Sequence, residues 1–204
     1  DIQQFQCKKL IVATGGNSKE ESYNWLKNLG HSIVKPVPSL FTFNIPDDPI
    51  TQLMGISVPL AKIKIKAAKL EMEGPLLITH WGISGPAVLK TSAVAARILH
   101  DLDYCFTISI SWLPKYTEEK LRIEFSNQRD EHAAKAVISN CPFELPKRLW
   151  EHFILHCQID RTTRWADLTK KNISELINCM IKNENQGKGK NTFKEEFEKS
   201  GGVK

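Results

Sequence analysis

The densest group of residues that could take part in chemistry is the segment Gly74–Pro86, which reads GPLLITHWGISGP. It has the form of a short strand, a glycine-rich turn and a helix start. Such a turn directs free backbone N–H groups and the positive end of a helix dipole towards an anion or the electron-rich edge of a cofactor. His80 could donate a proton or a hydrogen bond to a substrate carbonyl, and Trp81 could form the wall of a site for an aromatic ligand.

Each of these residues also has a structural explanation, and residue types alone favour it. His80 could be a hydrogen-bonded structural histidine, Trp81 could belong to the core, and Ser84 or Gly85 could simply cap the helix. A hydrolase that uses Ser84 and His80 is not favoured, because the G-x-S-x-G pattern is absent and Ser84 stands just before a helix.

Two further patterns are weaker. His152 and His156 are four residues apart on an expected helix with Cys157 next to them, but Cys157 would point about 100° away from His156 and no carboxylate completes a tetrahedral set. We therefore expect no metal site. The segment 187–190, GKGK, lacks the strand and the register of a phosphate-binding loop, so it is interpreted as part of a flexible turn over residues 185–190.

The elements that must position these residues begin with a short apolar run at residues 8–14, which stops at Gly15 and Gly16. Continuous apolarity indicates a strand buried on both faces of a parallel sheet, where terminal glycines let a ligand approach the backbone. A helix capped by Ser18 should follow and end at Gly30. The alternative is that residues 8–14 form an edge strand of an antiparallel sheet.

Three later segments alternate between apolar and polar residues, as half-buried strands do: 41–45, 61–67 and 104–112. The prolines between residues 36 and 75 argue against helices there. Lys62, Lys64 and Lys66 form a row on one strand face, which we interpret as solvated rather than as a nucleic-acid contact. Together the strands predict a small antiparallel sheet or barrel.

Helices should flank and follow this sheet. One begins at Pro86 and buries a stripe of mostly small residues, so it should pack closely on the sheet. After Trp112 the sequence turns helical, with helices expected around 117–127, 149–157 and 173–181, the last opened by Asn172. Phe193 and Phe197 then restore an extended pattern that ends in residues 200–203.

The composition fits one or two ordinary globular domains. The 204 residues carry 28 basic and 23 acidic side chains, and the excess of +5 is spread along the chain, with 11 basic and 9 acidic residues in 1–112 and the rest in 113–204. A basic half that would indicate nucleic-acid binding is therefore absent. No stretch reaches the roughly 18 apolar residues of a membrane span. The five cysteines form no C-x-x-C pair, which favours a reducing, cytoplasmic location.

Five motifs in order along the chain resemble one family: VATGG at 12–16, LGH at 29–31, PVPSL at 36–40, the block from Gly74 to Leu89, and GGV at 201–203. The sequence resembles the middle of bacterial NAD(P)/FAD-dependent oxidoreductases of the BaiN, RdsA and YhiN type. The resemblance implies an α+β fold in which a small antiparallel β-barrel and a helical subdomain are inserted into a Rossmann-type FAD domain.

From this resemblance we expect a stub of the FAD domain at 1–35, a barrel with one helix at 36–112, a helical subdomain at 113–186 and a return segment at 187–204. The family's N-terminal G-x-G-x-x-G segment and its C-terminal glycine-rich flavin segment do not occur in this sequence. Without the first there is no pyrophosphate cradle. The chain therefore looks like a fragment that we expect to be inactive alone and not to retain FAD.

The resemblance also implies roles for individual residues. Contacts to the FAD dinucleotide are implied for Thr14, Gly15 and Gly16 at a strand end and for Gly201 and Gly202 where the chain returns. The segment facing the substrate would contain Thr79, His80, Trp81, Ser84 and Gly85, with His80 as the catalytic candidate. The loop at 17–21, NSKEE, departs from the glycine- and proline-rich stretch that the family often has there, which puts ligand contacts of this loop in question.

The expected function is that of the substrate-facing insert of an FAD-dependent oxidoreductase, whose parent passes hydride from NAD(P)H through flavin to an unsaturated or carbonyl-containing small molecule. Neither a nucleic acid nor a membrane is an expected partner. The alternative is a self-contained module whose helical half binds nucleic acid or protein.

Overall fold

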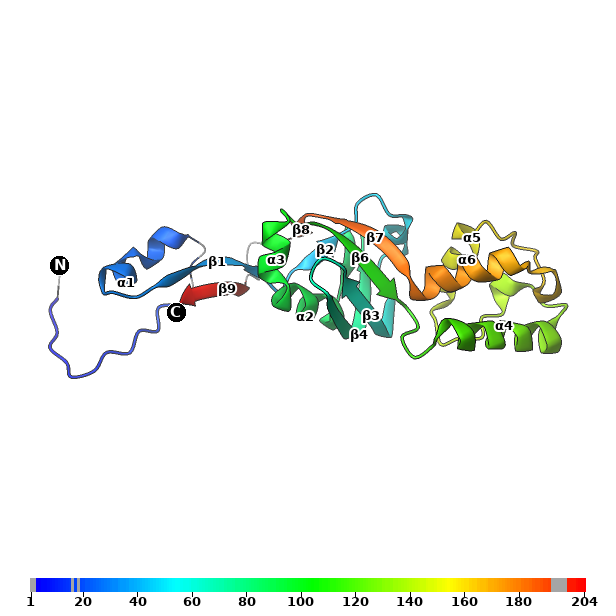
Figure 1. Cartoon of the computed structure of the whole chain (residues 1–204), viewed down its shortest axis with the longest axis horizontal. Coiled ribbons are helices and arrows are strands. Elements are labelled where there is room, and N and C mark those ends of the chain that lie inside the picture. Colours follow the sequence, from blue (N-terminus) through cyan, green and yellow to red (C-terminus); the bar gives the residue numbers. More distant parts are fainter. Residues whose placement is uncertain (1–2, 16, 18, 192–197) are drawn as a thin grey trace. The chain divides into compact units, whose positions relative to one another are not determined.

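The computed structural model describes residues 3–15, 17, 19–191 and 198–204 (Figure 1). The chain divides into two compact units, residues 1–37 with 201–204 and residues 38–200. No helix within the described ranges is long and apolar enough to cross a membrane.

The first unit contains a short helix and most of a two-stranded sheet. Its elements are a 3₁₀ turn η1 (Glu20–Tyr23), α1 (Asn24–Asn28), and the paired strands β1 (Ile33–Ser39) and β9 (Glu198–Val203). The helix ends, as predicted, at Gly30, whose φ of 89° favours glycine. The predicted cap Ser18 lies outside the described residues. Beyond β9, the Lys204 N–H donates to the Ser32 carbonyl at 2.9 Å.

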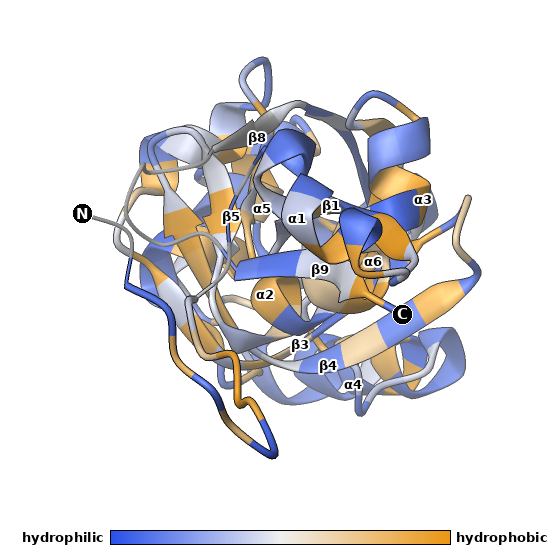
Figure 2. Ribbon diagram, turned by 90° about the vertical axis from the view of Figure 1, so that its left-hand side faces the viewer, coloured by the Kyte–Doolittle hydropathy of each residue, from blue (hydrophilic) through white to orange (hydrophobic). Residues whose placement is uncertain are grey.

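The apolar run at residues 8–14 forms no strand, which corrects the prediction of a buried parallel strand and of an edge strand alike. Leu10, Ile11 and Val12 are exposed, Ile11 to 91%. Figure 2 shows hydrophobic residues along this extended segment. A strand exists only through hydrogen bonds to neighbours, and the described part of the chain supplies none here.

The second unit is built on a seven-stranded sheet in which every pairing is antiparallel, in the order β7-β6-β3-β4-β5-β2-β8. Its strands are β2 (Thr42–Asn44), β3 (Ser57–Ile65), β4 (Leu70–Thr79), β5 (Gly82–Ser84), β6 (Cys105–Ser111), β7 (Asn183–Lys188) and β8 (Lys190–Asn191). Phe43, Ile63 and Ile108 are fully buried, as alternation predicted. A 3₁₀ turn, η2 (Pro49–Leu53), is the helical element between residues 36 and 75.

The sheet curls until its two edges meet. The edge strands β7 and β8 are separated by Gly189 alone, and the Gly189 N–H donates to the Tyr104 carbonyl at 2.9 Å. The flexible turn predicted for residues 185–190 is therefore wrong, because most of it is strand β7. Polar residues fit there because β7 is held by its backbone pairing to β6. Phe193 and Phe197 lie outside the described residues.

The predicted helix from Pro86 is two helices, α2 (Pro86–Val94) and α3 (Ala96–Asp101), which meet at Ala95. The expected close packing is confirmed: Val88 is fully buried, and the Ser92 hydroxyl accepts the Phe41 N–H at 2.9 Å. This bond fixes α2 to the residue that precedes β2.

Three helices lie in the chain between β6 and β7: α4 (Glu118–His132), α5 (Lys147–His156) and α6 (Lys170–Ile181), with 3₁₀ turns η3 (Val137–Ser139) and η4 (Trp165–Asp167) between them. Their core is aromatic, with ring contacts that include Phe125 to Trp165 and Phe143 to Trp150. The cap predicted at Asn172 is corrected to Thr169. Its hydroxyl accepts the Asn172 N–H, while the Asn172 side chain accepts the Thr169 N–H.

The barrel and the helices share one core. The backbone N–H of Trp112, just after β6, donates to the Met180 carbonyl of α6 at 2.8 Å, and the Arg148 side chain of α5 donates to the Gln52 carbonyl at 3.3 Å. The predicted α+β class, a small antiparallel barrel with a helical subdomain, is confirmed.

The lysine row on β3 is a solvated strand face, as interpreted from the sequence. Lys62 pairs with Glu73 at 3.0 Å and Lys64 with Glu71 at 2.7 Å across the β3–β4 pair, and Lys66 pairs with Glu184 of β7 at 2.7 Å. At these distances the carboxylates occupy the positions next to the lysine ammonium groups that the phosphates of a nucleic acid would need.

Candidate functional site

A tight hairpin between β4 and β5 presents His80 and Trp81. Thr79 pairs with Gly82, so these two residues form the whole turn. The Trp81 carbonyl accepts the Ile45 N–H at 2.8 Å, which fixes the turn to the end of β2. The His80 ring is exposed and packs edge-on against the Trp81 ring at a centroid separation of 3.9 Å. The imidazole of His80 therefore lies at the tip of the hairpin, where it packs against the Trp81 ring.

Gly82 permits this hairpin because the backbone of the neighbouring strand β2 lies close against it. Its φ is 155°, and a Cβ there would lie 2.1 Å from the Phe43 carbonyl oxygen and 2.8 Å from the Ile45 nitrogen. Both contacts are far below van der Waals distance, and both atoms are backbone. Residue 82 must therefore be glycine for β2, β5 and the His80–Trp81 turn to coexist.

Gly85 has a comparable role where α2 begins. Its φ is 99°, and a Cβ would lie 2.9 Å from the Pro75 carbonyl oxygen and 3.1 Å from the Leu77 nitrogen of β4. Gly85 is the N-cap residue and Pro86 follows at the first helical position, with no side chain capping the helix. The positive end of the α2 dipole consequently begins against the same strand that carries Thr79.

Three polar side chains share the outer face of the sheet beside this hairpin. Asn44, Thr79 and Ser84 each neighbour a fully or almost fully buried residue on their strand, so alternation points them away from the core. Asn44 and Thr79 are the two register partners of Gly82, on strands β2 and β4. They therefore lie about 10 Å apart, two strand spacings, with the glycine between them.

Two buried atoms on this face have no hydrogen-bond partner within the described ranges, the Thr79 Oγ1 and the Asn44 Oδ1. Buried polar atoms are normally paired, so each of these oxygens is a position where a water molecule or a polar group of a ligand can donate a hydrogen bond. The sequence had suggested Thr79, His80, Trp81, Ser84 and Gly85. Asn44 was missed, because a lone asparagine on a strand carries no signal until β2 is placed beside β5.

The candidate dinucleotide contacts lie in the other unit. Thr14 and Gly15 line a surface pocket of about 260 Å³ together with Tyr23, Trp25 and Leu26. This volume is below the roughly 300–1,000 Å³ of typical small-molecule sites. Gly16 lies outside the described residues.

The two C-terminal glycines differ in their surroundings. A Cβ on Gly201 would lie 2.8 Å from the carbonyl oxygens of Val34 and Lys35, so the pairing of β9 with β1 already requires a glycine there. Gly202 has a φ of 127° and Gly15 a φ of 74°, and both have open space where a side chain would be. Gly15 and Gly202 thus fit a ligand that approaches the backbone closely, but the described residues form no cradle large enough to enclose a dinucleotide.

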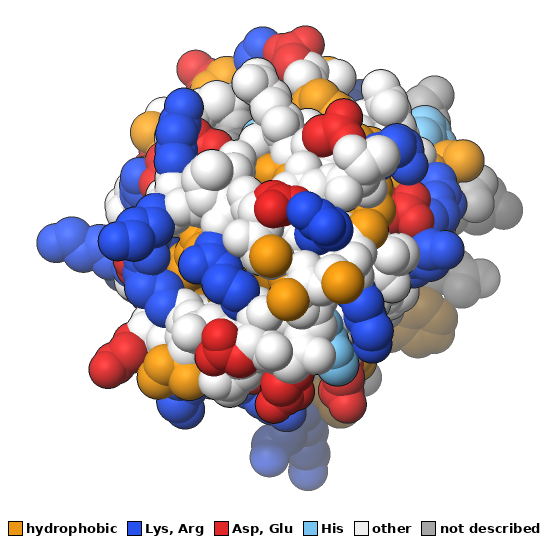
Figure 3. All heavy atoms as spheres, turned by 90° about the vertical axis from the view of Figure 1, so that its right-hand side faces the viewer, with side chains coloured by type: hydrophobic (Ala, Val, Ile, Leu, Met, Phe, Trp, Pro, Cys, Tyr) orange, Lys and Arg blue, Asp and Glu red, His pale blue; other side chains and the backbone are white. Residues whose placement is uncertain are grey.

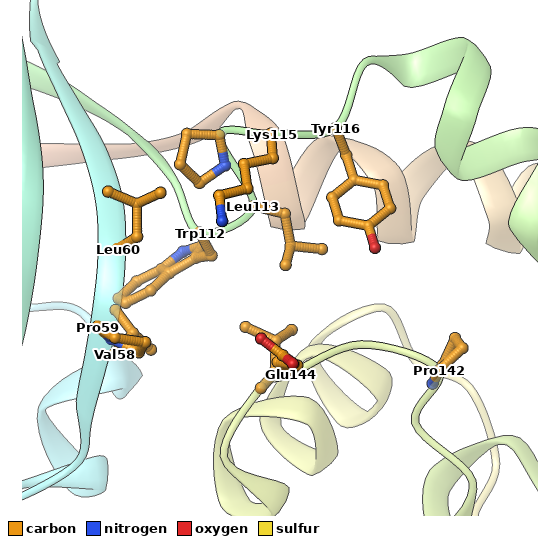
Figure 4. Close-up of a pocket in the computed structure, with 11 residues that line it drawn as sticks. Val58, Pro59, Leu60, Trp112, Leu113, Lys115, Tyr116, Pro142 and Glu144 are labelled. Carbon is orange, nitrogen blue, oxygen red and sulfur yellow. The ribbon is translucent and has the colours of Figure 1, made fainter.

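A pocket of about 480 Å³ lies between the barrel and the helices (Figure 4). Trp112 and Leu113 form an apolar wall, and Lys115 and Glu144 extend into the space from opposite sides. Its size and mixed lining suit a small molecule. None of the residues singled out in the sequence as candidate site residues lines it.

The suspected metal ligands do not assemble. The rings of His152 and His156 stack at a centroid separation of 5.8 Å. No group of three or more His, Cys, Asp or Glu side chains within the described ranges is arranged to hold a metal ion. Burial lowers the pKa of His152, and the nearby His156 lowers it further, so the charged form of this ring is disfavoured.

Comparison with known proteins shows what this architecture is similar to. Residues 37–197 match the model of the family described as "HI0933-like protein barrel and H2TH domain". The matched range covers the barrel and the three helices.

Three curated relatives are similar over much of the chain. The ribosomal RNA dihydrouridine synthase of Haemophilus influenzae is 33% identical over 160 residues, 74% of this chain and 37% of the relative. The protein of the same name from Escherichia coli K12 is 27% identical over 71% of this chain and 36% of the relative. The 3-dehydro-bile acid delta(4,6)-reductase of Clostridium scindens is 24% identical over 64% of this chain and 34% of the relative.

The chain thus spans about a third of the length of each of these relatives. The family expected from the sequence motifs is confirmed by the match over residues 37–197. This chain belongs to the HI0933-like family and contains its barrel and H2TH domain.

Proposed function

We propose that this chain is the barrel and helical region of an FAD-dependent oxidoreductase that reduces a carbon–carbon double bond conjugated with a carbonyl group. The hairpin of His80 and Trp81 receives the substrate. The observation that carries the proposal is the outer face beside this hairpin, where Thr79 and Asn44 each leave a buried oxygen unpaired next to an exposed histidine.

The names of the relatives support the reaction class. Dihydrouridine differs from uridine by two hydrogen atoms across a ring double bond that is conjugated with a carbonyl. A delta(4,6) reduction of a 3-dehydro bile acid also saturates carbon–carbon bonds in conjugation with a ketone. The two chemistries need the same parts, a hydride donor on one carbon and a proton or hydrogen-bond donor at the other end of the conjugated system.

The residues of this chain would orient the substrate. His80 donates a hydrogen bond to the substrate carbonyl, and the edge-on Trp81 ring limits how far the imidazole can turn. Thr79 Oγ1 and Asn44 Oδ1 bind polar groups of the substrate ring, and Ser84 lies on the same outer face. FAD, when bound, supplies the hydride that it takes from NAD(P)H. Thr14, Gly15, Gly16 and the Gly201–Gly202 pair would contact FAD, with Gly15 and Gly202 allowing the closest approach.

The experiment uses the full-length protein that contains this chain. It is purified, its flavin content is measured from visible absorbance, and NAD(P)H-dependent reduction is followed on two substrates, a ribosomal RNA transcript and a 3-oxo-4,6-diene steroid. We expect His80→Ala to lower turnover by about 10²–10⁴-fold, as loss of a positioned proton or hydrogen-bond donor does, with flavin content unchanged. His100→Ala, a change of a histidine on α3, is the matched control and should retain turnover.

The comparison of the two substrates also tests whether the protein acts on a small molecule, as expected, or on RNA. Reduction of the steroid alone would agree with a small-molecule substrate, whereas dihydrouridine in the transcript would replace that expectation with an RNA substrate. A full-length protein that contains no flavin and oxidises no NAD(P)H would refute the oxidoreductase. The 204-residue chain alone should bind no FAD, so flavin absorbance in that sample would contradict its proposed role as a partial site.

The competing proposal, a nucleic-acid or protein binding module, depends on the helical part. Figure 3 views the side on which α4, α5 and α6 lie and shows acidic side chains interspersed among the basic ones. Many of the basic groups are already paired: Arg122 and Lys182 contact Glu118, and Arg164 contacts Asp167 at 2.8 Å. Phosphate binding would have to displace these carboxylates. A gel shift of RNA by the 204-residue chain that weakens steeply with salt would favour this alternative.

A further inference from the structure

Two cysteines from different helices face each other in the helical part. The Sγ atoms of Cys157, the residue that ends α5, and Cys179, in the last turns of α6, are 3.4 Å apart. Both are free thiols. A disulfide has its sulfurs about 2.05 Å apart, so a side-chain rotation that moves them little more than an ångström closer would place them at bonding distance for an oxidant to join.

Small reagents can reach this pair from solvent. Cys157, Cys179 and His156 line the same surface pocket of about 440 Å³, together with Lys171 and Glu175. Cys157 itself is largely buried and Cys179 is half-buried, so access is through the pocket rather than across an open surface.

The two thiols are not equivalent. The hydrogen bond that they share lowers the pKa of Cys179 below its ordinary value and raises the pKa of Cys157, with burial acting against ionisation of both. Glu175 also opposes ionisation of Cys179. Cys179 is therefore the first of the two to become a thiolate, the form that attacks a disulfide.

We propose that Cys157 and Cys179 are a dithiol modification site, which closes to an intramolecular disulfide on reaction with a low-molecular-weight disulfide and which, when reduced, chelates a single trivalent arsenical. The geometry carries both parts, because each reaction needs two sulfurs within reach of one electrophile. The site lies in the helical part, and the residues of the His80 hairpin play no part in it.

The exchange proceeds in two steps that balance. The Cys179 thiolate attacks one sulfur of glutathione disulfide, which forms a mixed disulfide and releases one glutathione thiolate. Cys157 then loses its proton to that thiolate and attacks the Cys179 sulfur, which releases the second glutathione. The two cysteines lose two electrons and two protons, and glutathione disulfide is reduced to two glutathione molecules.

The other cysteines serve as internal controls. Cys7 and Cys105 are free thiols with exposed side chains. Cys141 donates its S–H to the Phe143 carbonyl, and burial raises its pKa to about 11, so it reacts slowly. For these three we expect mixed disulfides with glutathione.

The test measures mass on the full chain. Reduced protein is freed of reductant, incubated with glutathione disulfide, and the peptides after trypsin are analysed without reduction. Because Arg161, Arg164 and Lys171 lie between the two cysteines, a disulfide would join peptide 149–161 to peptide 172–182. We expect this linked pair, lighter by two hydrogen atoms than its separate halves, and one bound phenylarsine oxide per reduced chain.

Variants in which one cysteine is replaced by serine distinguish a reaction that needs both thiols from the reaction of a single thiol. Cys179→Ser and Cys157→Ser should each abolish the linked peptides and the arsenical adduct and carry glutathione on the remaining cysteine, whereas Cys105→Ser should behave as the wild type. Since Cys157→Ser changes a buried residue, its folding is checked by circular dichroism, and the wild-type peptide map remains a sufficient test even if this variant unfolds. Glutathione on Cys157 and Cys179 separately, or a linked peptide that involves another cysteine, would overturn the proposal.

Discussion

The carbonyl oxygen of Phe43 lies where a side chain on Gly82 would begin, because a Cβ built on that glycine is 2.1 Å from the oxygen. The contact joins β2 to β5 and thereby sets the position of the His80–Trp81 turn. The site is consequently sensitive to a single methyl group at a residue that performs no chemistry.

Gly82→Ala should lower the free energy of unfolding by roughly 2–5 kcal/mol, since the unfavourable backbone conformation costs about 1–2 kcal/mol and the overpacked contact about 1–3 kcal/mol. Urea denaturation of the 204-residue chain measures this. Gly55→Ala is the matched control, because Gly55 has a φ of 88° but open space around its Cβ position. It should cost about 1–2 kcal/mol, the conformational part alone. Equal losses for the two variants would mean that β2 does not press on residue 82.

A second prediction concerns Gly187 of β7, which pairs with Phe106 of β6. A Cβ on Gly187 would lie 3.1 Å from the Phe106 ring. Gly187→Ala should therefore destabilise the barrel by about 1–3 kcal/mol in denaturation experiments. The control is a double-mutant cycle with Phe106→Leu, in which most of this cost should disappear because the ring is absent. A cost that is unchanged in the Phe106→Leu background would show that the ring is not its cause.

A third prediction concerns stability in weak acid. Burial and the neighbouring His156 lower the pKa of His152 below its ordinary value of 6.5, with Asp48 acting in the opposite direction. The unfolded chain therefore binds a proton at His152 more readily than the folded chain, so stability rises with pH through this window and falls as the pH drops below about 6.5.

His152→Gln should remove part of that acid sensitivity. Urea unfolding at pH 7 and at pH 5 should show a smaller loss of stability for the variant than for the wild type, by at most about 1 kcal/mol because water screens the half-exposed ring. The same change at His132, near the exposed end of α4, is the control. Wild type and His152→Gln with identical pH profiles would contradict the assignment.

The sequence predicted the strands and helices in which the pattern of apolar and polar side chains shows which face is buried. Alternation located β2, β3 and β6, since one face of each is in the core. Strand β7 was not predicted because its sequence, NENQGK, is polar and its place depends on backbone bonds to β6. The run at residues 8–14 failed in the opposite way, because apolar residues alone cannot make a strand without a neighbour.

In the candidate site, too, the sequence revealed the residues that local backbone restrictions position and not those that pairing between distant elements brings there. The block from Thr79 to Pro86 was identifiable because glycine and proline at fixed spacing restrict the backbone locally. Asn44 was not, since it reaches the site through the pairing of β2 with β5. The contact between Cys157 and Cys179 was missed for the same reason, because it joins residues 22 apart in sequence through the packing of two helices.

The closure of the sheet at Gly189 has a consequence for aggregation. A sheet normally ends in two strands whose free N–H and C=O groups can pair with another protein molecule. Here one end, β8, has two residues within the part of the chain that the structure describes, and the other, β7, is polar and carries Glu184 and Lys188, both in ion pairs. Because a single glycine connects the two ends, neither offers a long apolar template, and the barrel is protected against pairing edge to edge with a second copy of itself.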